Sequence, residues 1–266
     1  YREDWLGYTS SRGDWIDGSA RPIIDVPSSL SSTATVLQLP DQYSSSAVFL
    51  ELRCGGSAAK GLYIKSYVNT ATSCVVKDCA TTATGSCYYG PGSAFGCSAS
   101  GGAKYGYFYN IMPTQCSAHD ADIGFYMSYV NETCYSCLAV DCTTYGFYST
   151  GDSAVHFGCV AEGCGQGFNL RSRNSTYQCG AANCTTGFQM PIAGTLQNCW
   201  AYNNTTNQNA TTGENYLVNF QELSSDPFES ATDLRINDAA AGGALLAAKG
   251  IGFAGGTQTS YSDNNA

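Results

Sequence analysis

A cysteine recurs through the middle of the chain at intervals of 19 to 23 residues. Eight copies define this spacing: Cys54, Cys74, Cys97, Cys116, Cys137, Cys159, Cys179 and Cys199. In most copies an alanine follows two residues later, and six of the eight contain a glycine followed by a bulky residue, as in Gly146-Phe147. Self-similarity at a fixed period over this length indicates a solenoid, in which each repeat packs on its neighbours.

The repeats are too short for helical solenoids and lack a 3.6-residue periodicity. Each holds short alternating segments separated by Gly, Asn, Asp and Thr, a pattern of strands and tight turns. Gly (30) and Tyr (19) are abundant and only 12% of residues are charged, which is a β-rich composition. We expect a parallel β-helix of about eight rungs, a rung being one circuit of the chain around the axis. Rungs about 4.8 Å apart give a rod on the order of 40 Å long.

A second column, five residues after the first cysteine, contains Cys79, Cys142, Cys164 and Cys184. The residue before this column reads Ala58, Asp78, Gly101, Asp120, Asp141, Gly163, Asn183 and Asn203. Apart from the alanine, these are the residue types that tolerate the left-handed backbone conformation. The column therefore predicts a corner with positive φ in each rung.

The Cys-x-Ala-x-(Asp/Asn)-Cys-x-x-Gly-Phe repeats resemble those of right-handed parallel β-helix proteins, which share their shape with pectate lyases. The segment SSDPFESATDLRINDAAAGGALL (224–246) resembles the closing segment of many such proteins. The resemblance covers roughly residues 47–250, and it implies a fold more than a function, because the family includes lyases, hydrolases, phage tailspikes and surface proteins. The expected fold class is all-β: a single-stranded right-handed parallel β-helix with non-repetitive N- and C-terminal arms.

Three segments follow from the repeat boundaries. We expect an N-terminal arm or cap over residues 1–46, β-helix repeats over 47–220, and a closing segment and tail over 221–266. The small-residue run 239–256 can lie against the last rung as a cap or reach into a neighbouring molecule. A solenoid exposes the backbone edges of its first and last rungs, and these must be capped or used for assembly.

The cysteines admit three interpretations. Stacked, buried thiols fit best, because cysteine behaves as a small apolar side chain and the nearby alanines suit the same narrow corner. Disulfides between rungs fit less well, since in-register side chains point the same way, but a bridge within a rung, such as Cys137 to Cys142, stays open. A metal needs ligands that converge on one point, and His119 and His156 fall outside the cysteine columns. We expect no metal and no cofactor.

Catalysis is the weaker of two interpretations of the corner carboxylates. Asp120 and Asp141 occupy one column in adjacent rungs, with His119 beside the first, and a glycosidase uses a carboxyl pair about 5 to 9 Å apart. Gly and Asn replace Asp in this column without pattern, however, so a structural corner explains it better. We expect that the chain is not an enzyme.

Aromatic residues are the other candidate binding groups. Tyrosines cluster on the second to fifth repeats, and some must face outward because neighbouring strand residues point in opposite directions. The candidate surface residues are Tyr107, Tyr126, Tyr148, Trp5 and Trp15. Such a surface can stack on sugar rings or dock a partner subunit.

The net charge of −9 argues against nucleic acid as a partner. No apolar run is long enough to span a membrane. The chain begins with Tyr1, as a processed protein or a piece of a longer one does. Six sequons could carry glycans in a secreted protein: Asn131, Asn174, Asn183, Asn203, Asn204 and Asn209.

Together these features favour an extracellular structural protein at a cell surface or in a virion fibre. Its main partner would be copies of itself, joined head to tail through the arms into a filament. The alternative is a phage-tail or secreted β-helix that binds, and perhaps cleaves, a polysaccharide.

Overall fold

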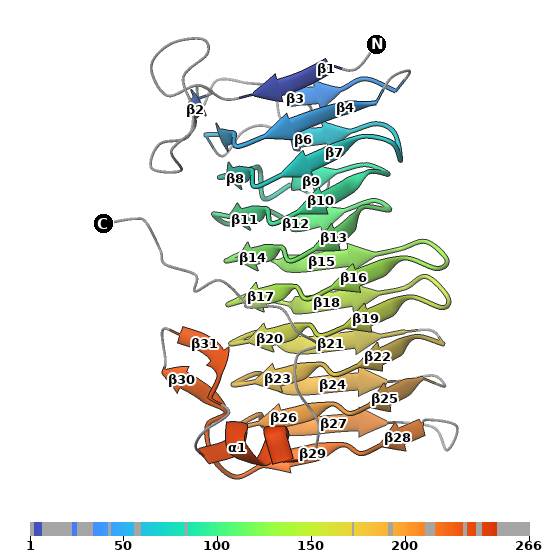
Figure 1. The fold of residues 1–266 in the computed structure, drawn as a ribbon, viewed down its shortest axis with the longest axis vertical. Helices are drawn as coiled ribbons and strands as arrows, with labels where there is room; N and C mark the ends of the chain where they lie inside the picture. The colour runs from blue at the N-terminus through green and yellow to red at the C-terminus, as the bar shows by residue number, and fades with distance from the viewer. Residues whose placement is uncertain are drawn as a thin grey trace.

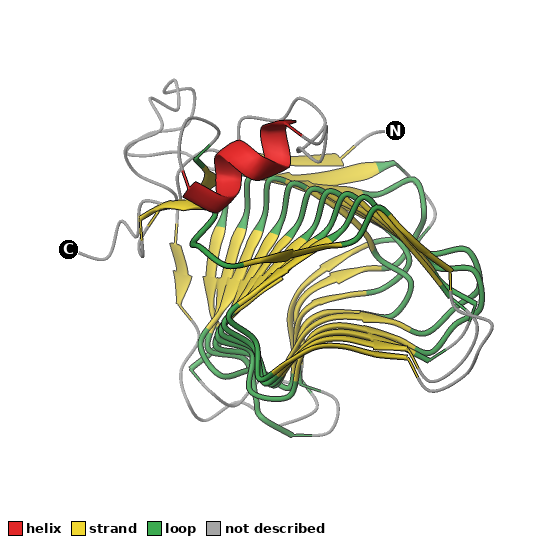
Figure 2. Cartoon of the chain, turned by 90° about the horizontal axis from the view of Figure 1, so that it is seen from below, coloured by secondary structure: helices red, strands yellow, loops and turns green. Residues whose placement is uncertain are grey.

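The computed structural model describes residues 3–6, 23–25, 34–41, 44–55, 60–82, 85–171, 173–190, 194–210, 216–230, 233–237 and 241–248. Three long parallel sheets, named A, B and C here, run the length of the molecule (Figure 1). Seen along the axis, they form the sides of a roughly triangular cross-section (Figure 2). The predicted right-handed parallel β-helix is confirmed, and its eight predicted rungs correspond to the strands from β4 to β27.

Each rung contributes one strand to each sheet. Sheet A contains β1 (Glu3–Leu6), β4 (Ser45–Val48), β7 (Thr70–Thr72), β10 (Ser93–Phe95), β13 (Met112–Thr114), β16 (Thr133–Tyr135), β19 (Val155–Phe157), β22 (Ser175–Tyr177), β25 (Thr195–Gln197) and β28 (Tyr216–Val218). Sheet B contains β2 (Ile23–Asp25), β5 (Glu51–Arg53), β8 (Val75–Lys77), β11 (Ser98–Ser100), β14 (Ser117–His119), β17 (Leu138–Val140), β20 (Val160–Glu162), β23 (Gly180–Ala182), β26 (Trp200–Tyr202) and β29 (Gln221–Leu223). Sheet C contains β3 (Thr35–Leu39), β6 (Lys60–Ile64), β9 (Ser86–Tyr89), β12 (Tyr105–Phe108), β15 (Ile123–Met127), β18 (Tyr145–Ser149), β21 (Gln166–Leu170), β24 (Thr186–Met190) and β27 (Thr206–Ala210).

Each rung turns through two corners of the same design: the last residue of a strand, a residue with positive φ, and an inward-facing residue that is usually cysteine. Between sheets A and B, Ser136 has φ 50° and the thiol of Cys137 lies 3.2 Å from the carbonyl oxygen of Tyr135. Between sheets B and C, Asp141 has φ 51° and precedes Cys142. A thiol is small enough for the corner and is a weak donor to the carbonyl of the residue two positions earlier.

The predicted left-handed column is confirmed at Asp78, Gly101, Asp120, Asp141, Gly163, Asn183 and Asn203, while Ala58 lies outside the described residues. The sequence interpretation missed the equivalent column at the other corner. That column is Phe49, Ser73, Gly96, Gln115, Ser136, Gly158, Gln178, Asn198 and Asn219. Its residue types are too mixed to indicate a left-handed conformation.

The interior is built from stacked columns. Six rings form a continuous pile, Tyr88, Tyr107, Phe125, Phe147, Phe168 and Phe188, with centroids 4.6–4.9 Å apart and planes within 8° of parallel. The glycine before most of these rings is needed because a Cβ would meet both the backbone of the next strand of sheet C and the alanines of sheet B. A Cβ at Gly146 would lie 2.8 Å from the carbonyl oxygen of Gly167 and 3.0 Å from the Cβ of Ala161.

Two predicted alignments are wrong at the N-terminal end. Leu50 precedes β5 as Cys74 precedes β8, so Leu50, and not Cys54, begins the first cysteine column; Cys54 packs on Cys79 in the second. The next repeat is one of the two in which the sequence shows no glycine followed by a bulky residue, yet Tyr88 of this rung pairs with Leu62 in the aromatic column. A longer connection between β8 and β9 shifts the glycine away from that position, so this rung does carry an inward aromatic ring.

The closing segment packs on the side of the solenoid. The antiparallel strands β30 (Phe228–Ser230) and β31 (Asp233–Ile236) and the helix α1 (Ala241–Ala248) accompany the last rungs (Figure 1). A second apolar cluster joins Trp200 and Leu223, on sheet B, to Phe228 and Leu246. In Figure 2 α1 lies beside one corner of the cross-section, so its described residues flank the last rung and do not cover it as a cap.

The corner between sheets A and B can be tested with two glycine substitutions that should change the free energy of unfolding in opposite directions. We expect Ser136→Gly to raise the free energy of unfolding by about 0.5–1 kcal/mol, because glycine adopts a positive φ without a Cβ clash. Ser117→Gly in the extended strand β14 should lower it by about 0.5–1 kcal/mol, since glycine loses more chain entropy there. Urea unfolding followed by circular dichroism measures both changes. Changes of the same sign would contradict the corner assignment.

Candidate functional surfaces

The corner carboxylates lie on the outside of adjacent rungs. Asp120 follows β14 and Asp141 follows β17; both are exposed, and His119 is half-buried. Burial and the negative charge of Asp120 raise the pKa of Asp141 above its ordinary value. The carboxylate of Asp141 also occupies the space that a Cβ at Gly163 would need, which explains the glycine of the next rung. The structure thus gives the column a structural role, and a catalytic role for these three residues stays a prediction.

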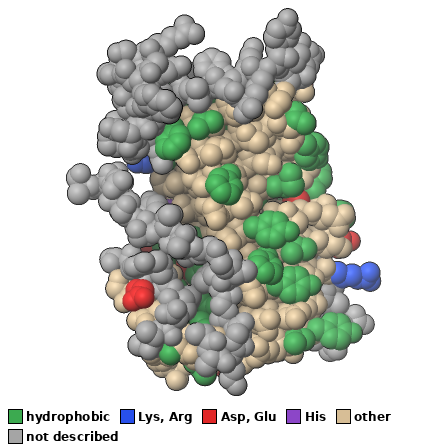
Figure 3. Space-filling model, viewed as in Figure 1, with side chains coloured by type: hydrophobic (Ala, Val, Ile, Leu, Met, Phe, Trp, Pro, Cys, Tyr) green, Lys and Arg blue, Asp and Glu red, His purple; other side chains and the backbone are tan. Residues whose placement is uncertain are grey.

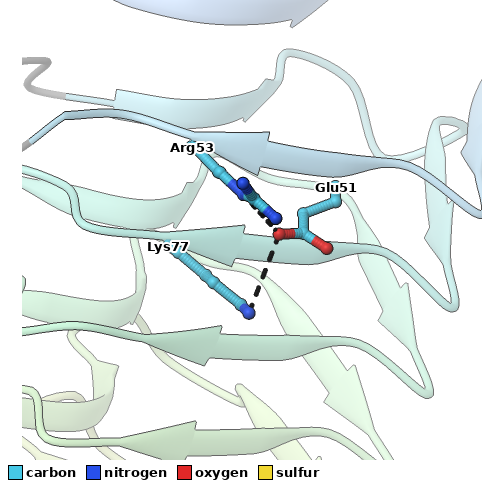
Figure 4. A network of polar contacts seen from close by, with 3 residues as sticks. All are labelled: Glu51, Arg53 and Lys77. Atoms are coloured by element: carbon cyan, nitrogen blue, oxygen red, sulfur yellow. Dashed lines mark hydrogen bonds and ion pairs between the residues drawn. The ribbon is translucent and has the colours of Figure 1, made fainter. Parts of the chain in front are cut away.

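The ion pairs of the described residues do not involve the corner carboxylates Asp120 and Asp141. On the outer face of sheet B, Glu51 accepts a hydrogen bond of 2.7 Å from Nε of Arg53 and lies 3.7 Å from Nζ of Lys77 in the next rung (Figure 4). Lys104 pairs with Asp122 next to sheet C. Burial alone would raise the pKa of Asp122, but the bonds from Lys104 and Thr144 hold it below its ordinary value. The pairs Glu51–Lys77 and Lys104–Asp122 join successive rungs, whereas Glu51 and Arg53 lie on the same strand.

Sheet C carries an outer column of aromatic side chains, which we call the aromatic face: Tyr63, Tyr89, Phe108, Tyr126 and Tyr148. All five are partly exposed, and Tyr105 and Tyr145 stack beside them. Beyond Tyr148 the same column continues with the amides Asn169, Gln189 and Asn209. Since the rings of Tyr126 and Tyr148 stack at 5.1 Å and 14°, their faces meet each other and their edges remain for solvent. Four of the five aromatic residues of this face carry a hydroxyl group, and ring faces are stacked from Phe108 to Tyr148, whereas Tyr63, Tyr89 and Phe108 meet edge to face.

One predicted surface residue is wrong. Tyr107 is 1% exposed, and its hydroxyl donates to the carbonyl oxygen of Cys97 at 2.8 Å. Gly106 and Tyr107 both face inward, so the alternation of strand residues fails at this position. Tyr126 and Tyr148 do lie on the outer side of sheet C, Trp5 belongs to β1, and Trp15 lies outside the described residues.

Cations border the aromatic face although the net charge is −9. Nζ of Lys60 lies 3.9 Å from the ring centroid of Tyr89, and the guanidinium of Arg171 lies 5.5 Å from that of Tyr148. Lys65 lies 6.0 Å from the ring of Tyr63. On the side seen in Figure 3, by contrast, few charged side chains are visible.

Both ends of the solenoid expose side chains that are buried in the other rungs. At the C-terminal end, Leu217 of β28 is 43% exposed, whereas its partner Leu196 one rung earlier is 0% exposed. At the N-terminal end, Ile24 of β2 is 38% exposed and its partner Leu52 is 0% exposed. Strands β1, β2 and β3 end the three sheets on one side, and β28, β29 and β27 end them on the other. Among the described residues, the strands at each end therefore pair with a neighbouring strand on one edge only.

The sequons differ in access. Asn174 is 1% exposed, and its side chain accepts from the amide of Ala154 at 2.9 Å, so the folded chain has no room for a glycan there. Asn204 is half-buried and bonds Cys184 and Ala181. The side chains of Asn183, Asn203 and Asn209 are exposed and bonded within ladders along the axis. Asn131 is exposed on a loop at φ 62°. Glycosylation of the accessible sites stays a prediction.

Among the described histidines and carboxylates, His156 and Glu132 are buried. His156 is fully buried with Nε2 3.1 Å from the hydroxyl of Ser149, and burial lowers its pKa from 6.5 to about 4. The carboxylate of Glu132 is also buried and accepts from the amide of Tyr129 at 2.9 Å. Burial raises the pKa of Glu132 from 4.5 to about 7, against the lowering effect of bonds from backbone amides. No group of three or more His, Cys, Asp or Glu within the described ranges is arranged to hold a metal.

Comparison with protein-family models, with curated proteins and with solved structures gave no match. The β-helix architecture is therefore shown by the fold itself, and the likeness to pectate lyases remains a resemblance of the sequence. In the part of the chain that is described, no helix has the length and apolar character needed to cross a bilayer.

The two buried groups predict opposing effects of pH on stability. His156 takes up a proton more readily when unfolded, so it removes stability as pH falls from about 6.5 to about 4, by about 3 kcal/mol in all. Glu132 loses its proton more readily when unfolded, so it removes stability as pH rises from 4.5 to about 7. Between pH 4.5 and 6.5 the two contributions cancel in part.

Substitutions at Glu132 and His156 separate the two contributions to the pH dependence of stability. Relative to the native protein, Glu132→Gln should make stability rise more steeply with pH between 4.5 and 6.5. His156→Thr, which copies Thr176 of the next rung, should make stability fall with pH over the same range. The free energy of unfolding from urea titrations at half-unit pH steps measures both slopes. Profiles parallel to that of the native protein would show that neither group has the assigned pKa.

Proposed function

We propose that the protein is an extracellular structural subunit that stacks end to end into a filament. The observation that carries this proposal is the exposure of inward-facing apolar side chains at both ends, Ile24 at one and Leu217 at the other. Each end also presents strand edges of sheets A and B, which run in the same direction as in any internal rung. The last rung of one molecule is thus a template for the first rung of the next.

The contact would continue sheets A and B. Strand β28 would pair with β1 of the next molecule and β29 with β2, both in the parallel sense already used along the solenoid. The last described strand of sheet C, β27, belongs to the rung before β28 and β29, so a gap of one rung would separate it from β3 of the next molecule. Pairing would satisfy backbone groups at both edges and bury the exposed end residues. Because the two surfaces differ, the contact is heterologous and repeats without closing, which gives a filament.

The test uses variants that block one end each. Leu217→Asp places a charge in the C-terminal contact, and Ile24→Asp places one in the N-terminal contact. Each variant alone should sediment as a monomer under conditions in which the native protein forms filaments visible by electron microscopy. An equimolar mixture should form dimers and stop there, because only one pair of intact ends remains.

Phe95→Asp is the matched control. Phe95 is 49% exposed on the outer side of sheet A in the middle of the solenoid, so this variant should assemble like the native protein. A native protein that stays monomeric at high concentration would refute the proposal. Dimers in either single-variant sample would instead indicate a side-to-side contact.

The second candidate function is binding of a polysaccharide along the aromatic face. It is favoured by the row of hydroxyl and amide groups there and by Lys60 and Arg171 at its margins. A linear surface with a polar group on most rungs suits a linear polymer that can hydrogen-bond at regular intervals. From Phe108 to Tyr148 the mode would be edge-on hydrogen bonding, because neighbouring rings occupy the ring faces there.

Retardation in native gels cast with anionic or neutral polysaccharides tests this candidate. Tyr126→Ser and Arg171→Gln should each weaken retardation several-fold, and Tyr135→Ser on sheet A should leave it unchanged. Equal mobility in all the gels, or equal loss in the three variants, would count against binding at the aromatic face.

A further inference from the structure

Cys54 and Cys79 meet although they occupy different positions in their rungs. The amide of Cys54 donates to the carbonyl of Lys77, just as the amide of Asp78 donates to that of Ser100. Cys54 is therefore the counterpart of Asp78, the residue before Cys79. The left-handed residue of this corner is Gly55, at φ 59°, which follows the cysteine. The side chain of Cys54 consequently points inward, where it is 0% exposed.

This difference removes the obstacle to a disulfide between rungs. Cysteines at equivalent positions project in parallel, and a disulfide needs a dihedral angle near 90° about its sulfur–sulfur bond. Side chains from non-equivalent positions approach from different directions, so they do not have this restriction. The Sγ atoms of Cys54 and Cys79 lie 3.0 Å apart. Cys134 and Cys159, a second pair at non-equivalent positions, have their Sγ atoms 3.8 Å apart, so Cys54 and Cys79 are the closer pair.

We infer that Cys54 and Cys79 are a redox pair that closes to a disulfide, while the other twelve cysteines remain thiols. The oxidant is a low-molecular-weight disulfide. One thiol loses its proton and attacks this disulfide, forming a mixed disulfide and releasing one small thiol. The second protein thiol then displaces the other small thiol, so two electrons and two protons pass to the oxidant. Gly55, which follows Cys54, is exposed, whereas Cys54 and Cys79 are 0% and 1% exposed, so the reaction requires this corner to open transiently.

The bridge would fasten the N-terminal end of the solenoid. It joins the rung of β5 to the rung of β8, and the two cysteines are 25 positions apart in sequence. End rungs have a neighbour on one side only, so they open most easily. A covalent link there restrains the rung next to the proposed contact surface. The inference does not depend on filament formation, because the thiols can be assayed on monomers.

The experiment uses the full chain incubated with oxidised or reduced glutathione. Thiols are trapped with N-ethylmaleimide in denaturant, and the digest is mapped by mass spectrometry. The oxidised sample should yield one cross-linked peptide pair, joining Cys54 to Cys79, with the other twelve cysteines alkylated. Its thermal midpoint should exceed that of the reduced sample by roughly 5 °C.

Cys79→Ala should abolish both the cross-link and the thermal shift. Cys142→Ala, a control in the same column at the middle of the solenoid, should keep both. Cys54→Ser provides a second disabled variant if Cys79→Ala does not fold, and the native comparison needs no variant. Fourteen alkylated cysteines after oxidation, or a cross-link from Cys79 to Cys87 or between Cys134 and Cys159 in place of the expected one, would overturn the inference.

Discussion

Stacking of equivalent residues at the spacing of one rung is the constraint on which this structure depends. Hydrogen bonds between parallel strands set the distance between rungs, so every interior column repeats one shape along the axis. Rings of Tyr and Phe fill the widest column at 4.6–4.9 Å between centroids. Glycine and alanine fill the narrowest, where Gly146 faces Ala161 across the core. A substitution that places a larger side chain in one of these columns would therefore disturb the two neighbouring rungs as well as its own.

The cysteines follow from the same constraint. No disulfide joins any of the fourteen, all of which are described and buried. Eleven of them directly follow a left-handed residue at a corner. The thiol there can lie close to the carbonyl two residues earlier, as for Cys137 and Tyr135. Both corners of a rung use this arrangement, which accounts for two cysteine columns and not one. Among the corner cysteines Cys54 is the exception, because its corner places the left-handed residue after the cysteine. That irregularity is what brings it against Cys79.

Stacking also defines where a partner can attach. Interior rungs are satisfied above and below, whereas the two end rungs expose apolar residues of interior columns, such as Leu217. Outer columns inherit the same repeat, so the aromatic face presents a regular row of groups along the rod. The ends therefore suit a second copy of the chain, and the aromatic face suits a linear polymer. The two proposals use different surfaces and do not exclude each other.

The repeat alone was sufficient to predict the fold class, the eight rungs and the corner at Asp120 and Asp141, because side chains of fixed type recur wherever a rung imposes one shape. It did not reveal the corner at Ser136, since serine and glutamine carry no preference strong enough to indicate a positive φ. It misplaced Tyr107 on the surface, because two consecutive inward residues break the alternation of a strand. It also misaligned Cys54.

The candidate surfaces depend on contacts that no periodicity encodes. The sequence by itself determined the columns of equivalent residues, because these follow from the spacing at which residue types recur along the chain. Only the tertiary structure decided what does not repeat: the exposed ends, the orientation of the ring edges, the burial of His156 and Glu132, and the meeting of Cys54 with Cys79. Those properties depend on which rung, if any, lies on the other side of each residue.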